Sequence, residues 1–297
     1  MPNRLDSIKM HIELIDNDGK LYIVATPIGN LSDLSQRALH ILNRVDKIAA
    51  EDTRTTRRLL DHFGIGTKLT ALHDHNEHRV AHELIGEISG GASLALVSDA
   101  GTPLINDPGF ELLNLAIAQG IEVVPIPGPS ACISALSVSG LATDRFSFLG
   151  FAPRTRNARV AWFRSLIEQS GTLIFYESCH RILACLDDCA AVFPAERKLV
   201  IGRELTKCHE RIYRGRIADI ESFRLDPNLQ KGELVVLVQG SEVKPKTEEH
   251  SAEAIRILRI LLRECSLKTS AELAARITGL SRKMLYAAAL EIKQEGD

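Results

Sequence analysis

The sequence predicts an α/β protein made of two α/β domains and a small helical C-terminal extension. Three observations favour this class. Short apolar runs alternate with amphipathic helical segments through the first half, which is the pattern of a mainly parallel sheet. One such run, SLALVSD at 93–99, is almost wholly apolar, as expected of a central strand covered on both faces. Three later strand-like runs joined by short links favour antiparallel pairing, hence a mixed second sheet.

Each element is predicted from a local pattern. Helices are indicated where apolar residues recur three or four positions apart, as Val80, Leu84 and Ile88 do, and Gly64 is a C-cap signal. In the first half the predicted strands are 21–26, 47–51, 68–73, 93–99 and 121–127, and the predicted helices are 32–45, 53–64, 77–89 and 109–119. In the second half the predicted strands are 145–151, 172–178, 198–205, 209–217 and 232–240, and the predicted helices are 130–139, 157–169, 180–193 and a helical tail over 251–294.

The elements divide the chain into four segments, with the inner boundary near Pro127–Pro129. A polar linker, SEVKPKTEEH, separates the second domain from the tail. The predicted segments are a flexible leader at 1–20, an N-terminal α/β domain at 21–127, a C-terminal α/β domain at 128–240, and a linker and tail at 241–297.

Composition and charge exclude several classes of protein. Hydrophobic residues are 45% and charged residues 25% of the 297 residues, and the net charge is −2. There is no apolar run of 18 residues and no apolar segment of a secretory signal near the N-terminus, so we expect a cytoplasmic protein without a membrane span. None of the six cysteines forms a C-x-x-C pair, so we expect reduced, structural cysteines. Two locally basic windows, 151–164 and 197–216, are either a nucleic-acid surface or an ordinary solvated one.

Three stiff loops follow predicted strands. The sequence has neither a P-loop nor a G-x-G-x-x-G motif. Instead, TPIGN (26–30), DAGTPLINDPG (99–109) and PGPSA (127–131) combine glycines, which allow close backbone approach, with prolines, which restrict the chain. Ligands of open α/β sheets bind at the carboxyl ends of the strands. Singly, each loop is explained by a tight turn or, for Ser130, by a helix cap; together they favour a shaped ligand site.

Eight motifs carry a family resemblance. TPIGNLSDLSQRAL, AAEDTR, LHDHNE, VSDAGTPLINDPG, PGPSA, IFYES with the following HR, RELTK and KGE occur in this order between residues 21 and 240. In this the chain resembles the bacterial 16S ribosomal RNA cytidine 2′-O-methyltransferases, which belong to the tetrapyrrole-methylase-like enzymes that use S-adenosyl-L-methionine. The resemblance implies a cofactor cleft between the two domains, a 16S rRNA substrate within the 30S subunit, a homodimer and no metal.

The resemblance also implies roles for individual residues. The first loop here is TPIGN, whereas the wider group often has a glycine-rich loop. The residues implied to bind the cofactor are Pro27, Gly101, Thr102, Pro103, Leu104, Ser130, Ala131, Tyr176, Glu177, Leu205, Gly232 and Glu233.

The methyl-transfer reaction depends above all on the positioning of the two reactants. Methyl transfer from a sulfonium is an in-line displacement, and a ribose 2′-hydroxyl is a poor nucleophile that a general base assists. Candidate bases are Glu51, Asp52, Asp99 and Glu177, of which we favour Glu177 and Asp99 as catalytic residues. The residues favoured for RNA binding are Arg54, Arg154, Arg156, Arg203 and Lys207. For each charged residue a structural ion pair is the competing interpretation.

Two further signals stay open at this point. His78 and His82 are four residues apart on one predicted helix, as in zinc motifs, but H-E-x-x-H is absent, so we expect surface histidines and no metal. In the tail, Ala275, Gly279 and Leu285 have the spacing of a helix-turn-helix, which favours either an RNA-docking unit or an ordinary helical hairpin.

Two alternative functions compete with the RNA methyltransferase. A small-molecule methyltransferase acting on a tetrapyrrole would not need the arginines of the first basic window or the tail. A non-enzymatic binding protein would bind nucleic acid but not the cofactor.

Overall fold

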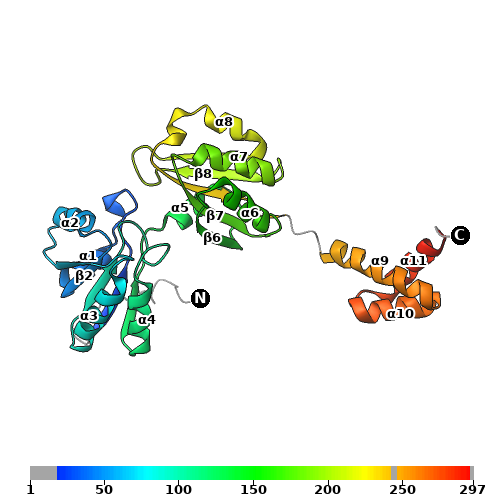
Figure 1. Cartoon of the computed structure of the whole chain (residues 1–297), viewed down its shortest axis with the longest axis horizontal. Coiled ribbons are helices and arrows are strands. Elements are labelled where there is room, and N and C mark those ends of the chain that lie inside the picture. The colour runs from blue at the N-terminus through cyan, green and yellow to red at the C-terminus, as the bar shows by residue number, and fades with distance from the viewer. Residues whose placement is uncertain (1–18, 242–245, 295–297) are drawn as a thin grey trace, which may run out of the picture. The chain divides into compact units, whose positions relative to one another are not determined.

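The computed structural model describes residues 19–241 and 246–294 (Figure 1). Nearly all of the predicted leader, and residues 242–245 of the predicted linker, lie outside these ranges. The chain divides into two compact units, with the boundary between Gly240 and Ser241. In the described ranges, no helix is both long enough and apolar enough to cross a membrane.

The first sheet is parallel throughout, with the strand order β3-β2-β4-β1-β5. This confirms the parallel sheet predicted from the alternation of strands and helices. The strands are β1 (Lys20–Val24), β2 (Lys47–Ala50), β3 (Lys68–Ala71), β4 (Leu94–Val97) and β5 (Glu122–Ile126). The helices are the short 3-10 helix η1 (Leu31–Asp33), α1 (Gln36–Arg44), α2 (Thr53–His62), α3 (Glu77–Ser89) and α4 (Phe110–Ala118).

Helices cover both faces of this sheet. Successive residues of a strand point to opposite faces, so Tyr22 and Val24 of β1 pack with α1 and α2 in one cluster, whereas Leu21 packs with α3 and α4 in another. All four residues of the central strand β4 are buried. The near-continuous apolar character of 93–99 therefore reports burial on both faces, as predicted.

The second sheet is mixed, with the order β6-β7-β10-β8-β9. The pairs β10–β8 and β8–β9, among the three late strands, are antiparallel, as the short links predicted. The pair β7–β10 is antiparallel as well. The pair β6–β7 is parallel, because α6 crosses from the end of one strand to the start of the other. The elements are α5 (Ala131–Ser139), β6 (Phe146–Phe151), α6 (Arg156–Leu166), β7 (Thr172–Ser178), α7 (Ile182–Val192), β8 (Lys198–Arg203), β9 (Arg211–Arg216), η2 (Ile217–Asp219), α8 (Ile220–Arg224), η3 (Pro227–Gln230) and β10 (Glu233–Val238).

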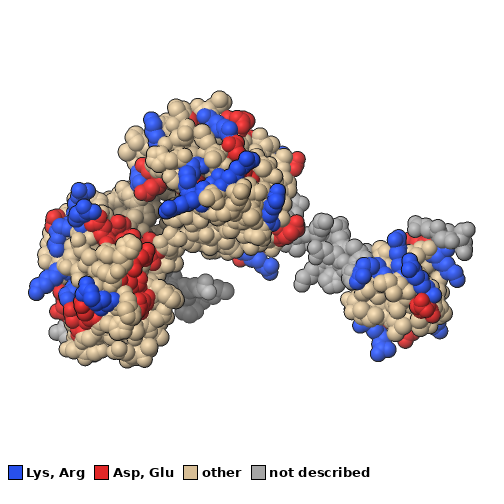
Figure 2. All heavy atoms as spheres, viewed as in Figure 1, with Lys and Arg blue, Asp and Glu red and all other residues tan. Residues whose placement is uncertain are grey.

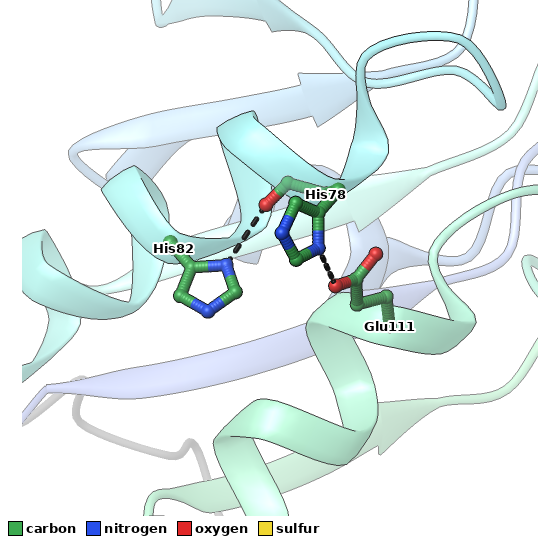
Figure 3. A group of neighbouring side chains, drawn as sticks. All are labelled: His78, His82 and Glu111. Atoms are coloured by element: carbon green, nitrogen blue, oxygen red, sulfur yellow. Dashed lines mark hydrogen bonds and ion pairs between the residues drawn. The ribbon is translucent and has the colours of Figure 1, made fainter.

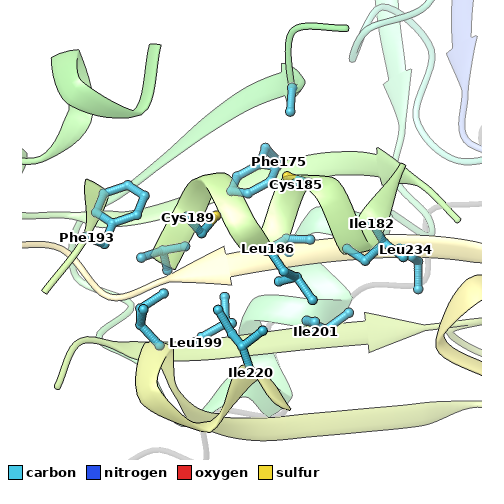
Figure 4. Close-up of a cluster of buried hydrophobic side chains, with 14 of the residues drawn as sticks. Phe175, Ile182, Cys185, Leu186, Cys189, Phe193, Leu199, Ile201, Ile220 and Leu234 are labelled. Atoms are coloured by element: carbon cyan, nitrogen blue, oxygen red, sulfur yellow. The ribbon is translucent and has the colours of Figure 1, made fainter. Parts of the chain in front are cut away.

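Buried apolar side chains pack against both faces of the second sheet, as they do for the first. Leu199 and Ile201 of β8 pack with α6, α7 and α8 in the cluster of Figure 4, which includes Phe175 and Leu234. Val200, between them, packs on the opposite face with α5. That second cluster also contains Ile28 of the TPIGN loop, so a residue from the first half of the chain is part of the second sheet's core.

One arginine of the first basic window is internal. Arg159 on α6 is 3% exposed, and its Nη2 lies 2.5 Å from Oδ2 of Asp188 on α7, which is 2% exposed. Its Nη1 also donates to the carbonyl oxygen of Pro153 at 3.2 Å. Arg159 therefore joins α6 to α7 inside the fold, and the window 151–164 is less of an exposed basic surface than its sequence suggests.

The tail is a three-helix unit rather than one long helix. Its helices are α9 (Lys246–Glu264), α10 (Leu267–Thr278) and α11 (Arg282–Gln294). Gly279 ends α10 in a left-handed conformation (φ 72°), with its N–H donating to Ala275 O at 2.9 Å. Leu258, Ala274 and Leu285 are fully or almost fully buried where the three helices meet. The three positions that predicted a helix-turn-helix thus lie as follows: Ala275 near the end of α10, Gly279 in the turn, and Leu285 on the packed face of α11.

We expect Asp188→Asn to destabilise the protein strongly, because it leaves the Arg159 guanidinium buried without its counter-charge. The expected loss in the free energy of unfolding is about 3–5 kcal/mol, measured by urea denaturation. Asp187→Asn is the matched control, since Asp187 is 62% exposed and pairs with Arg224 at the surface. It should cost less than about 1 kcal/mol. Equal losses in the two variants would contradict the role given to the buried pair.

Candidate active site

The loops predicted to form a site are joined to one another. Thr26, after β1, and Gly101, after β4, form an antiparallel bridge in which Thr26 N donates to Gly101 O at 2.8 Å and Gly101 N donates to Thr26 O at 3.0 Å. The Thr26 hydroxyl also donates to Ser98 O at 3.2 Å. The Thr102 hydroxyl donates to Pro129 O, in the loop after β5, at 3.1 Å. The three strand-end loops therefore form one continuous wall.

A cavity of about 550 Å³ lies against this wall and is closed by residues of the second sheet. Most residues predicted to bind a cofactor line it. From the first half of the chain and the start of α5 these are Gly101, Thr102, Ser130 and Ala131; from the second half they are Tyr176, Glu177, Leu205, Gly232 and Glu233.

Three predicted residues do not line the cavity. Pro103 is buried in the loop, and Leu104 packs against the core next to α3 and α4. Pro27 is half-buried, whereas its neighbour Ile28 does border the cavity. Asn106 and Phe151 also line the cavity and were not predicted. Asn106 lies in the loop motif DAGTPLINDPG, so the sequence identifies the loop, but only the fold shows which of its side chains line the cavity.

The loops around the cavity hold an unusual backbone. Of the described residues other than glycine, only Leu104, Asn106, Glu204 and Thr206 have a positive φ, between 48° and 74°. They belong to two loops, and each loop contributes residues to the cavity. Residues other than glycine rarely adopt this backbone conformation, and such backbone strain concentrates at functional sites.

The lining is acidic. It includes Glu51, Asp99, Asp107, Glu177 and Glu233, and none of the residues described around the cavity is Lys or Arg. Partial burial raises the pKa of the Asp99, Glu51 and Asp107 carboxyls, and repulsion between neighbouring carboxylates raises each further. Figure 2 shows a band of Asp and Glu side chains on the body formed by the first sheet.

Glu177 is held by one oxygen and free at the other. Its Oε1 lies 2.6 Å from Nη2 of Arg181 and accepts the Ser178 N–H at 2.6 Å. Its Oε2 is buried and has no hydrogen-bond partner among the described residues. Leaving a buried acceptor unsatisfied is costly, so this oxygen is suited to accept a hydrogen bond from a ligand.

The positive-φ loop 204–207 closes onto the first half of the chain. Glu204 Oε1 accepts hydrogen bonds from Lys207 Nζ and from Glu233 N, both at 2.9 Å. Burial lowers the pKa of Lys207, but its hydrogen bonds to Glu204 and Glu233 outweigh this and raise it overall. The aliphatic chain of Lys207 lies over Gly29, where a Cβ atom would be only 2.3 Å from Lys207 Cγ.

The predicted RNA-binding cations divide into two groups. The side chains of Arg54 and Arg156 are 86% and 80% exposed, and Arg154 is also exposed. Arg203 is 7% exposed and donates to Lys231 O and His209 O, each at 2.9 Å. Arg203 thus has a structural role, and the less exposed Lys207 pairs with two carboxylates. The arginines at 54, 154 and 156 are the exposed members of the set, of which Arg54 pairs with Asp52 and Arg156 with Asp188.

Known proteins share this fold. The chain matches the family described as Tetrapyrrole (Corrin/Porphyrin) Methylases over residues 20–221. Cobalt precorrin-4 methyltransferase superposes with a TM-score of 0.56 at 14% identity, covering 76% of this chain and 97% of that one. Uroporphyrin-III-C-methyltransferase from Thermus thermophilus gives 0.52 at 20% identity, covering 74% and 94%. The fold is that of the tetrapyrrole methylases, and the chain belongs to that family.

Closer relatives narrow the class. Ribosomal RNA small subunit methyltransferase I of Escherichia coli O157:H7 is 48% identical over 285 residues, covering 96% of this chain and 99% of the relative. The protein of the same name from Pseudomonas aeruginosa is 49% identical over 274 residues, covering 92% and 97%. Residues 248–293 match the RsmI C-terminal HTH domain. The chain belongs to the ribosomal RNA small subunit methyltransferase I family.

We expect Glu51→Gln to stabilise the protein at neutral pH. Because burial and the nearby Asp99 and Asp107 raise the pKa of Glu51 in the folded state, that state binds more protons than the unfolded one between the two pKa values. The free energy of unfolding therefore falls as pH rises through this window. Removing the charge should raise the stability at pH 7, and the gain should shrink as the pH is lowered toward about 4.

Asp226→Asn is a control of opposite sign in the same urea denaturation series. The N–H of Asn228 and the hydroxyl of Tyr213 lower the pKa of Asp226, so its contribution to stability is present at neutral pH and is lost as pH falls. This variant should be less stable than wild type at pH 7, with a smaller difference in acid. An E51Q variant less stable than wild type at pH 7 would refute the assigned cause.

Proposed function

We propose that this protein is an S-adenosyl-L-methionine-dependent methyltransferase that methylates the ribose 2′-hydroxyl of a cytidine in the decoding region of 16S ribosomal RNA. The observation that carries the proposal is the cavity at the strand ends, lined by five carboxylates and no Lys or Arg, in a chain of this family. Such a lining favours a cationic ligand, and a sulfonium is one. The same carboxylates bind the neutral thioether product less well.

The cavity residues fit this cofactor. When bound, S-adenosyl-L-methionine supplies the methyl group. The unpartnered Oε2 of Glu177 would accept a hydrogen bond from the cofactor's hydroxyl or amino groups. Gly101, at φ 86°, brings backbone to the cavity wall, and Tyr176 and Leu205 supply apolar surface from the second sheet. Residues 21–127 and 128–240 are, in this proposal, the two domains that supply the opposite walls.

The two predicted catalytic carboxylates have different roles in this scheme. Glu177 is fixed by Arg181 and by the Ser178 N–H, so it serves to bind and orient. Asp99 stands exposed at the mouth of the cavity, where its Oδ1 accepts the Asp52 N–H at 3.0 Å. Its raised pKa makes it a stronger base than an ordinary aspartate. We therefore assign proton removal from the 2′-hydroxyl to Asp99.

The RNA is held outside the cavity. The exposed side chains of Arg54, Arg154 and Arg156 are phosphate contacts in this proposal. The tail contributes cations as well, although it is not strongly cationic overall: residues 251–297 contain eight Lys and Arg against six Asp and Glu. Figure 2 shows Lys and Arg side chains over the described part of this unit. Arg282 and Lys283 begin α11, the second helix of the helix-turn-helix, which is the position that contacts nucleic acid in that motif.

A homodimer is part of the proposal. Helix α4 exposes two large apolar side chains, Phe110 and Ile117, at 71% and 60% of their surface. These residues are the candidate contact between two copies.

We expect Asp99→Asn to lower kcat by about a hundredfold or more while changing cofactor affinity little. The assay follows transfer of labelled methyl groups to 30S subunits from a strain that lacks this methylation, and calorimetry measures cofactor binding. Asp107→Asn is the matched control, since Asp107 lines the same cavity and its pKa is also raised. It should keep kcat within a few-fold of wild type. Unlabelled 30S subunits with the wild-type enzyme would refute the RNA substrate itself.

The tail assignment has its own test. Replacing Arg282 and Lys283 by alanine should weaken RNA binding and reduce the slope of log K against log salt by about 1.4–1.8. Lys293→Ala, in the last turn of the same helix, should change the slope by less than half as much. Equal effects per charge at the two ends of α11 would argue for a diffuse cationic surface instead of a docked helix.

A further inference from the structure

Three side chains outside the cavity form a compact cluster. His78 and His82 lie on α3 and Glu111 lies in the first turn of α4, as Figure 3 shows. One potential metal-ligating atom from each lies within 4.8 Å of those from the other two. In the part of the chain that the structure describes, no other set of three His, Cys, Asp or Glu side chains meets that condition.

The backbone under the cluster is held in place. Glu77 Oε1 accepts hydrogen bonds from Gly109 N at 3.1 Å and from Glu111 N at 2.7 Å. This carboxylate binds the N-terminal turn of α4 to the N-terminal turn of α3. The spacing of four residues puts the two histidines on one face of α3, with ring centroids 4.9 Å apart. The two elements are therefore fixed relative to each other without any ion.

The hydrogen bonds select one ring nitrogen of each histidine. His82 Nδ1 lies 2.8 Å from the carbonyl oxygen of His78, which can only accept, so His82 Nδ1 carries the proton. His78 Nδ1 contacts the Glu111 carboxylate, and donates to it for the same reason. A neutral imidazole has one donor and one acceptor, so the acceptor of each ring is Nε2. Histidine ligands of metals characteristically donate their other N–H to a carboxylate or a backbone carbonyl, which is the arrangement found here.

We propose that His78 and His82 bind a divalent transition metal of the zinc type through their Nε2 atoms, with the Glu111 carboxylate orienting His78. Imidazole nitrogens suit Zn²⁺, Ni²⁺ and Cu²⁺, and water completes the coordination. The His78 side chain is 83% exposed, so an ion reaches the site from solvent without a change in the fold. The site lies on the helices that follow β3 and the cavity loop, and takes no part in methyl transfer.

The proposed site also adjoins a helix that follows a cavity-lining loop. Helix α4 begins directly after the loop 99–109, part of which lines the cavity. An ion held by α3, with its carboxylate partner on α4, stabilises the folded state in proportion to how tightly it binds that state alone. We therefore expect Zn²⁺ to raise the thermal midpoint of the wild-type protein.

The test is calorimetric titration of the full-length protein, without an affinity tag, with Zn²⁺. Wild type should show a saturable site that the double variant His78→Ala, His82→Ala lacks. That double variant also measures binding by other groups, such as the exposed thiol of Cys208. Glu111→Ala should weaken the site about tenfold or more, and Glu111→Gln, whose amide oxygen still accepts from Nδ1–H, should weaken it less.

Arg79→Ala is the matched control, because Arg79 is exposed on the same helix between the two histidines and pairs with Glu83. It should bind Zn²⁺ like wild type and show the same rise in thermal midpoint. The proposal is overturned if the double variant binds Zn²⁺ with the stoichiometry and affinity of wild type, or if wild type shows no saturable binding. Circular dichroism of each variant without metal separates loss of the site from loss of the fold.

Discussion

The bridge between Thr26 and Gly101 is the interaction on which the rest of the site depends. Two strands that are neighbours in a parallel sheet diverge where they end, and here two reciprocal backbone hydrogen bonds hold their loops together. Because Gly101 has a φ of 86°, any other residue would strain the bridge. Ile28, two residues after Thr26, then enters the core of the second sheet. The bridge thus fixes both the cavity wall and the contact between the two sheets.

The same region is built at the expense of stability. Carboxyl groups with raised pKa values destabilise the folded state at neutral pH, and each non-glycine residue at positive φ adds strain. Asp99 and Asp107 supply the first effect, and Leu104 and Asn106, within the same loop, supply the second. Double-faced cores on both sheets offset these losses. These destabilising carboxylates and strained residues are concentrated in one loop, as is typical of a binding site, because a bound ligand relieves the repulsion and the strain. A well-packed core contains no such destabilising groups.

The sequence predicted most of the fold and a good part of the site, and the limits have a physical pattern. Elements and loops follow from local periodicity and from glycine and proline positions, so the parallel sheet and the three strand-end loops could be found. Pairings over a long separation could not. From the sequence alone, Arg159 is interpreted as a basic surface residue. In the fold it pairs with Asp188, which lies on another helix. Arg203 is likewise predicted from the sequence to contact RNA. In the structure it donates hydrogen bonds to the carbonyl oxygens of Lys231 and His209.

Charge separates the two tasks of the proposed enzyme. A cavity lined by five carboxylates attracts a cationic cofactor but repels the phosphates of RNA. The exposed side chains of Arg54, Arg154 and Arg156 do not line the cavity, so they are the proposed phosphate contacts. Only the ribose and its base must then enter the acidic site, and neither of them carries a negative charge.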